Sequence, residues 1–169
     1  DPALREEAFA FAAKKTKGLE ILDAGLGSRY ADLRKRSVDG LVKKHTAAAQ
    51  ALLVRALDDE DRDVRLAALD SLVDADARPA LSAAIDSLYA DVRLRSAKAL
   101  ARHGDPMALG PLVALATAPE PTEKEWQANW LKLAESALDG LGELGDPAAL
   151  LDVIPMIGAT IRRQAPLSG

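Results

Sequence analysis

The sequence contains no cysteine, few aromatic residues and no long apolar run. Among its 169 residues, the absence of cysteine excludes a disulfide framework, a thiolate metal site and a cysteine nucleophile. Aromatic residues make up only 4% of the chain, so no large aromatic nucleus is expected in the core. No apolar stretch is long enough to span a bilayer, and no charged and then apolar leader opens the chain. We therefore expect a cytoplasmic protein with no membrane partner.

Alanine, leucine and charged residues dominate what is present. Hydrophobic residues make up 49% of the chain and charged residues 28%, which is typical of a soluble folded protein. Alanine and leucine are both strong helix formers, so close packing of helix on helix is expected. The richness in alanine and arginine is typical of a high-GC bacterial source. Because the sequence begins with Asp1 and not with Met, we interpret it as a fragment of a longer chain.

The net charge of −4 is unevenly distributed along the chain. Residues 1–57 contain 11 Lys and Arg against 7 Asp and Glu, a balance of +4, whereas the remaining residues balance to −8. Such asymmetry either marks a binding end or is incidental.

A pattern of ten residues recurs along the chain. It begins with Asp, an aliphatic residue and Arg, and small or apolar residues follow at helical spacing. Clear copies occupy residues 32–41, 63–72 and 91–100, and a degenerate fourth copy occupies residues 132–141. The turn sequence Gly-Asp-Pro follows at residues 104–106 and 145–147, where Gly can close one helix in the left-handed conformation, Asp can cap the next helix and Pro fits its first turn. The repeating unit is therefore a helix, a tight turn, a second helix and a short loop.

This organisation predicts an all-α protein. Helices are expected near residues 2–15, 17–26, 29–44, 46–57, 61–74, 79–88, 90–103, 106–117, 122–144 and 147–158. A further helix is expected to begin near residues 161–163.

On the Asp-Val-Arg helix start, the Ala and Leu spacing and the Gly-Asp-Pro turn, the chain resembles the HEAT repeats. In particular it is similar to the short HEAT-like variety also found in phycobilisome (PBS) lyases. The resemblance covers residues 30–158, and residues 1–29 by period alone. It implies an armadillo-like helical fold, a right-handed α-α superhelix or α-solenoid of about five helix pairs in one array over residues 1–169. Its repeat units would span approximately residues 1–28, 29–58, 61–89, 90–118 and 122–158.

The repeated helices have a predicted inner and outer side. Positions one, five and nine after the Asp share one helical face and should be buried. They are Leu33, Ser37, Leu41, Val64, Ala68, Leu72, Val92, Ser96 and Leu100. The eighth position is small in every copy, so that two helices can approach closely. The defining Asp and Arg residues resemble acid–base pairs, but in HEAT-like stacks they commonly form a ladder between neighbouring repeats.

Positions four, seven and eleven fall on the opposite side, which lines the concave surface in the family. In the first copy they are Arg36, Asp39 and Lys43, and in the second Ala67, Asp70 and Asp74. In the third they are Arg95, Lys98 and Arg102, and in the fourth Ser136, Asp139 and Glu143. The bands alternate between basic and acidic, so they are either a charged groove for a polar partner or ordinary solvated helix faces.

Trp126 and Trp130 lie four residues apart on one helical face, after an insertion at residues 119–122. Either they pack the long helix onto its neighbours, or they are aromatic anchors at a partner surface. The residues predicted to bind a partner are Arg36, Lys43, Arg95, Lys98, Arg102, Trp126 and Trp130.

No motif selects a reaction or a cofactor. His45 and His103 are the only histidines, and neither belongs to a metal-ligand spacing or to the His-Glu pairs of the HEAT-repeat enzyme deoxyhypusine hydroxylase. No phosphate loop and no nucleophile elbow occurs. We therefore predict a scaffold for protein–protein interaction with no catalytic residue, no cofactor and no metal, whose partner is another protein or a peptide.

Two other functions remain open. The first is a nucleic-acid-binding module that resembles the HEAT-like alkylpurine DNA glycosylases, although the acidic bands would repel phosphates. The second is a relative of the chromophore lyases, although no Cys or His is placed to handle a thiol adduct.

Overall fold

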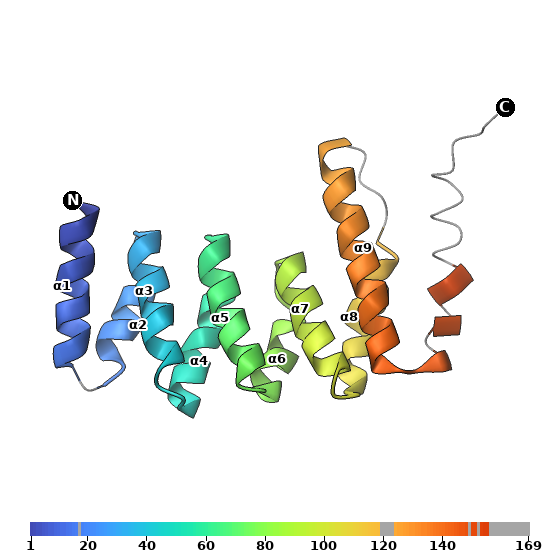
Figure 1. Cartoon of the computed structure of the whole chain (residues 1–169), viewed down its shortest axis with the longest axis horizontal. Coiled ribbons are helices and arrows are strands. Elements are labelled where there is room, and N and C mark those ends of the chain that lie inside the picture. Colours follow the sequence, from blue (N-terminus) through green and yellow to red (C-terminus); the bar gives the residue numbers. More distant parts are fainter. Residues whose placement is uncertain (17, 119–123, 149, 152, 156–169) are drawn as a thin grey trace. The chain divides into compact units, whose positions relative to one another are not determined.

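Every regular element in the described part of the chain is a helix (Figure 1). The computed structural model describes residues 1–16, 18–118, 124–148, 150–151 and 153–155, and for residues 124–130 it describes the backbone alone. The elements are α1 (Pro2–Lys15), α2 (Glu20–Leu26), α3 (Ala31–Val42), α4 (Ala47–Ala56), α5 (Arg62–Asp74), α6 (Arg78–Ala84), α7 (Ala90–Ala101), the 3₁₀ helix η1 (Pro106–Ala108), α8 (Leu109–Ala116) and α9 (Lys124–Leu144). Residues 147–148, 150–151 and 153–155 are also helical. The prediction of an all-α protein is confirmed for these ranges. The helix predicted near residues 161–163 lies outside the described residues.

The tight turns have the predicted chemistry. Gly104 and Gly145 close their helices in the left-handed region, with φ of +66° and +70°. Asp105 and Asp146, which follow them, each accept a hydrogen bond from the backbone N–H two residues later, both at 3.0 Å. The glycine relieves the steric cost of a positive φ, and the Asp satisfies an N–H that the next helix leaves unpaired.

Two of the helices whose bounds differ from the prediction share a local feature. The helix predicted over residues 29–44 begins at Ala31, and the one predicted over residues 79–88 ends at Ala84. At both places a serine side chain folds the loop before the next helix: Ser28 Oγ accepts from the Tyr30 backbone N–H, and Ser87 Oγ accepts from the Tyr89 backbone N–H, each at 3.2 Å. Turns of this type compete with helix formation, and the helical pattern did not identify them.

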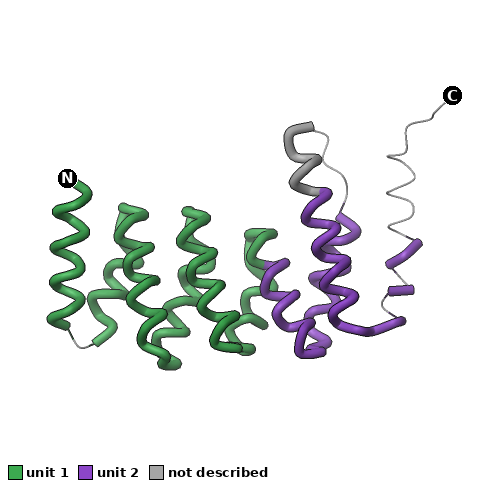
Figure 2. Tube along the Cα trace, viewed as in Figure 1, with its two compact units in different colours: residues 1–92 green, residues 93–169 purple. Residues whose placement is uncertain are grey.

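The chain divides into two compact units, Asp1–Val92 and Arg93–Gly169 (Figure 2). In unit 1, α3 packs against α1 and α5, and α2, α4 and α6 lie behind this layer (Figure 1). Each of α3 and α5 also packs against the helices that precede and follow it in sequence. In unit 2, α8 packs against α9 and against η1.

The predicted inner face of the repeated helices is buried at every position except Leu33, which is half-buried. Unit 1 also buries Val38 and Leu69, which occupy the sixth position after the Asp and which the nine predicted core positions did not include. The buried stripe is therefore wider than predicted, because α3 and α5 are covered both by the helices behind them and by their neighbours in the same layer.

The small eighth position brings helices close together, as expected. An added Cβ on Gly40 would lie 2.6 Å from Leu22 Cδ2 of α2. An added Cβ on Gly140, the corresponding residue of α9, would lie 2.9 Å from Leu112 Cδ2 of α8. Real Cβ atoms essentially never make contacts under 3.0 Å, so a side chain at either position would push the neighbouring leucine aside.

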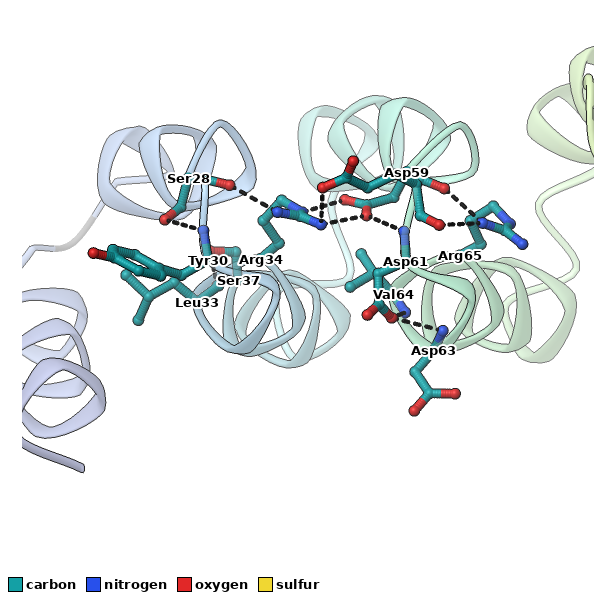
Figure 3. A network of polar contacts seen from close by, with 11 residues as sticks. Ser28, Tyr30, Leu33, Arg34, Ser37, Asp59, Asp61, Asp63, Val64 and Arg65 are labelled. Atoms are coloured by element: carbon teal, nitrogen blue, oxygen red, sulfur yellow. Dashed lines mark hydrogen bonds and ion pairs between the residues drawn. The ribbon is translucent and has the colours of Figure 1, made fainter. Parts of the chain in front are cut away.

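A ladder of arginines, of which Arg34 and Arg65 are buried, joins successive helix pairs of unit 1, and Arg34 is its best-connected member (Figure 3). Arg34 donates from Nε and Nη2 to the two carboxylate oxygens of Asp59, at 2.8 and 3.0 Å, and from Nη1 to the carbonyl of Ser28 at 3.0 Å. It therefore connects the turn before α3 with the turn before α5. The hydrogen bond with Asp59 raises the pKa of Arg34, so the guanidinium keeps its charge although it is buried.

Arg65 and Arg5 also belong to the ladder, but each of them stacks on a tyrosine ring. Arg65 donates to the carbonyl of Asp59 at 2.7 Å, and its guanidinium lies 3.6 Å from the ring centroid of Tyr89. Arg5 lies 3.7 Å from the ring centroid of Tyr30 and donates to Asp32 Oδ2 at 2.6 Å. Two arginines thus stack on a tyrosine of the next turn, whereas Arg34 binds a carboxylate there.

Candidate functional site

The charged band predicted for the first repeat faces solvent. Arg36, Asp39 and Lys43 are all exposed, while Ser37, Val38 and Leu41 on the other sides of the same helix are buried. The helical period that buries one stripe of α3 therefore exposes the opposite stripe, as the sequence predicts.

Arg36 and Lys43 line a common cavity between α1 and α3. The open cavity has a volume of about 330 Å³. It is lined by Phe9, Ala10, Ala13, Leu22, Arg36, Asp39, Gly40, Val42 and Lys43. Its wall from α1 is entirely apolar, and the charged groups come from α3 and from Lys43 at its C-terminal cap. Most of this lining is hydrocarbon with a few polar groups at one side, an arrangement typical of sites that accept an apolar side chain and fix its orientation.

The ion pair beside this cavity is weak. Arg36 Nη2 lies 3.4 Å from Glu6 Oε2, and the two side chains are 47% and 40% exposed. An ion pair this exposed contributes about 0–1 kcal/mol, so Arg36 can exchange Glu6 for the carboxylate of a ligand at little cost. Asp39 lies between Arg36 and Lys43 in the helix and would repel an acidic group placed midway. The cavity therefore favours an apolar group with separated carboxylates over a uniformly acidic segment.

The corresponding stripe of α5 in the same unit is acidic. Asp70 and Asp74 are exposed, and Ala67 is half-buried. Since α3 and α5 are neighbours, the basic stripe of α3 is bordered by an acidic one. This alternation limits where a polyanion could lie along unit 1.

In unit 2 the basic stripe of α7 is partly neutralised by α9. Arg95 and Arg102 are exposed, and Lys98 is half-buried. Lys98 Nζ donates to Ser136 Oγ at 3.2 Å, and Arg102 Nε lies 3.6 Å from Glu143 Oε2. The stripe predicted in sequence as three clustered cations is therefore less available than the composition of α7 alone suggests.

The two tryptophans lie in the helical backbone of α9 (Lys124–Leu144). The side chains of Trp126 and Trp130 lie outside the described residues. Their assignment as packing residues or as anchors for a partner stays a prediction.

The described residues offer few groups for chemistry. Within residues 1–16, 18–118 and the described part from 124 to 155, no group of three or more His, Asp or Glu is placed to hold a metal ion. No helix of this part is both long enough and apolar enough to cross a bilayer. His45 and His103 are both exposed, and His45 has a φ of +47° at the turn between α3 and α4.

Three features of the site were missed by the sequence reasoning. The apolar wall of the cavity, above all Phe9, comes from α1, whose sequence does not carry the Asp at the start of the repeat. Glu6 of α1 was not identified as the partner of Arg36. Arg5 was not recognised as a member of the arginine ladder because Ala3 stands where the later copies have Asp. The recurring signal that could have revealed Arg5 is the Tyr-Ala-Asp start shared by residues 30–32 and 89–91.

No protein-family model matches the chain, and no curated protein matches it.

Proposed function

We propose that the chain is a non-catalytic protein-interaction module, built as a right-handed HEAT-like α-solenoid, that binds an acidic peptide segment of another protein. The observation that carries this proposal is the cavity between α1 and α3, where Arg36 and Lys43 flank an apolar wall. The regular layering of helix pairs in unit 1 supports the solenoid, because in such an array each pair contacts only its neighbours and leaves a continuous surface for docking.

The chemistry of the cavity defines the ligand. An aliphatic or aromatic side chain would enter between Phe9 and Val42, and a carboxylate on each side of it would reach Arg36 and Lys43. The affinity should fall with added salt, because both cations lie at the surface where screening is strong. The balance of +4 in residues 1–57 would speed the encounter with an acidic segment.

The test is selection of binders from a random peptide library on the immobilised chain, followed by fluorescence anisotropy with the selected peptides. We expect the peptides to share an apolar residue flanked by Asp or Glu. The double variant Arg36→Glu/Lys43→Glu should weaken their binding at least tenfold, which corresponds to about 1.4 kcal/mol.

A matched control is available on the same helix and its end. Lys35→Glu/Lys44→Glu makes the same change in net charge, and both lysines are exposed but do not line the cavity. We expect this control to bind the peptides within about twofold of the parent chain. Equal losses in both double variants, or no enrichment of acidic peptides, would refute the proposal.

A further inference from the structure

The two cations of the cavity between α1 and α3 are in different electrostatic surroundings. Arg36 Nη2 lies 3.4 Å from Oε2 of Glu6, which belongs to α1. Lys43 follows Arg36 by seven residues, or about 10 Å along the helix axis, and forms no ion pair with any residue that the structure describes. One end of the cavity therefore already has a carboxylate beside its cation, and the other end has none.

The residue before Glu6 determines where the Glu6 carboxylate lies. Arg5 donates to Asp32 Oδ2 at 2.6 Å, and its guanidinium lies 3.7 Å from the ring centroid of Tyr30. Both contacts are with the start of α3, so they hold the first turns of α1 beside the first turns of α3. Glu6 is thereby placed next to Arg36, which lies one turn after Asp32 in α3.

Glu6 contacts Arg36 without entering the apolar part of the cavity. The residues that α1 contributes to the lining are Phe9, Ala10 and Ala13, and Glu6 is not among them. A ligand can therefore insert an apolar side chain while Glu6 stays beside Arg36. A ligand carboxylate at Arg36, however, has either to displace Glu6 or to lie next to a like charge.

The repeat does not require this ion pair. When the arginines of the ladder are aligned, Lys35 of α3 occupies the position of Glu6, and Ala67 of α5 occupies the position of Arg36. A lysine and an alanine cannot form an ion pair, although α3 and α5 pack together as α1 and α3 do. The pair of Glu6 with Arg36 is also too exposed to contribute much to stability. A role in binding therefore accounts for it better than a role in the fold.

We propose that Glu6 is an internal competitor for the acidic ligand, because its carboxylate occupies Arg36 until a carboxylate of the peptide displaces it. This inference rests on the proposed function and adds a residue that sets the specificity of the same site. Removal of the Glu6 charge should strengthen the preference for an acidic residue at the Arg36 end of the cavity. The preference at the Lys43 end should not change.

The test measures the affinity of Glu6→Gln for the acidic peptides selected on the parent chain, by fluorescence anisotropy. Because the ion pair that the ligand displaces is exposed, we expect the affinity to rise about two- to fivefold. The gain should shrink as salt is added, since the charges are screened at the surface. The midpoint of urea unfolding should stay close to that of the parent chain, because the pair contributes little to stability.

Glu7→Gln is the matched control. Glu7 is the next residue of α1, is exposed and forms no ion pair with a described residue. The variant therefore makes the same change in net charge without releasing Arg36, and its affinity should stay close to that of the parent chain. Equal gains in Glu6→Gln and Glu7→Gln would show a general effect of charge and would overturn the inference.

Two further measurements decide whether the gain depends on Arg36. In a chain that carries Arg36→Gln, the additional change Glu6→Gln should give no more gain than Glu7→Gln, because no guanidinium is released. In a chain that keeps Arg36, the gain should vanish when one of the two flanking acidic residues of the peptide is replaced by its amide, and persist when the other is replaced.

The outcomes separate this inference from the proposed function. Parent-like affinity of Glu6→Gln, a full gain in the Arg36→Gln chain, or a gain that neither peptide replacement removes would overturn the inference alone, because the parent chain would still bind acidic peptides. A parent chain that enriches no acidic peptide would overturn both.

Discussion

Replacement of Arg34 by Leu should be among the most destabilising single changes in unit 1. Arg34 and Asp59 form a bidentate pair whose side chains are each 8% exposed. Loss of the arginine leaves a nearly buried carboxylate without its partner, which typically costs about 3–5 kcal/mol. The carbonyl of Ser28 loses a donor at the same time. We therefore expect the free energy of unfolding to fall by about 3–5 kcal/mol.

The pair between Arg55 and Asp23 provides the control. Its N–O distance of 2.6 Å is shorter than the 2.8 Å of Arg34 and Asp59, but its side chains are 60% and 48% exposed. An exposed pair contributes about 0–1 kcal/mol, so Arg55→Leu should change the unfolding free energy by less than about 1 kcal/mol. The comparison therefore separates burial from distance as the cause of the effect.

The assay is urea unfolding followed by circular dichroism, with the midpoint compared at an unchanged denaturant slope. Arg34→Lys should recover only part of the loss, because an ammonium cannot bind both carboxylate oxygens and the Ser28 carbonyl in one plane. Similar losses in Arg34→Leu and Arg55→Leu would refute the reasoning. So would full stability in Arg34→Lys.

Four further outcomes follow from local geometry. Gly104→Ala should destabilise the chain by about 1 kcal/mol because its φ is +66°, whereas Gly110→Ala, with open space around its Cβ inside α8, should stabilise it by up to about 1 kcal/mol in the same urea assay. Gly25→Ala should cost about 1–3 kcal/mol, since its Cβ would collide with Ser37 Oγ, and an unchanged midpoint would contradict the close packing of α2 on α3. The hydrogen bond from Arg5 lowers the pKa of Asp32 below its usual value of 3.8. The stabilisation by this pair is therefore fully present above pH 3.8 and is lost as the pH falls through the lowered pKa. In Arg5→Gln the pKa of Asp32 should rise, which NMR titration of the carboxyl group would measure.

The helix ends and the buried stripe could be predicted from the sequence, because capping residues and the helical period determine them. The helices begin and end near their predicted residues wherever a Gly or a capping Asp marks the turn, as at Gly104 and Asp105. The inner stripe followed from the helical period, which Ser37 and Leu41 illustrate. Ser87 shows where prediction from the sequence fails. Its side chain folds the turn after α6, but a serine at this position could equally have continued α6 or capped the next helix.

The candidate site could be predicted only in part. Exposure of Arg36 and Lys43 followed from their positions on α3, but the cavity beside them depends on how far α1 lies from α3. That distance is set by Phe9 and by neighbours from separate segments, which no repeat pattern in α3 encodes. The hydrogen bond of Lys98 could not be predicted for a similar reason, because Ser136 reaches it from 38 residues later in the chain.

The arginine ladder also determines how damage would spread through unit 1. Arg5 depends on the turn before α3, Arg34 on the turn before α5, and Arg65 on the turn before α7. Melting of any one hairpin therefore removes the partner of an arginine in the hairpin before it; that guanidinium is buried for Arg34 and Arg65 and half-buried for Arg5, and the unpaired buried charges make partial states costly. Unit 1, held in this way, should resist fraying from one end and lose its order in a single cooperative step.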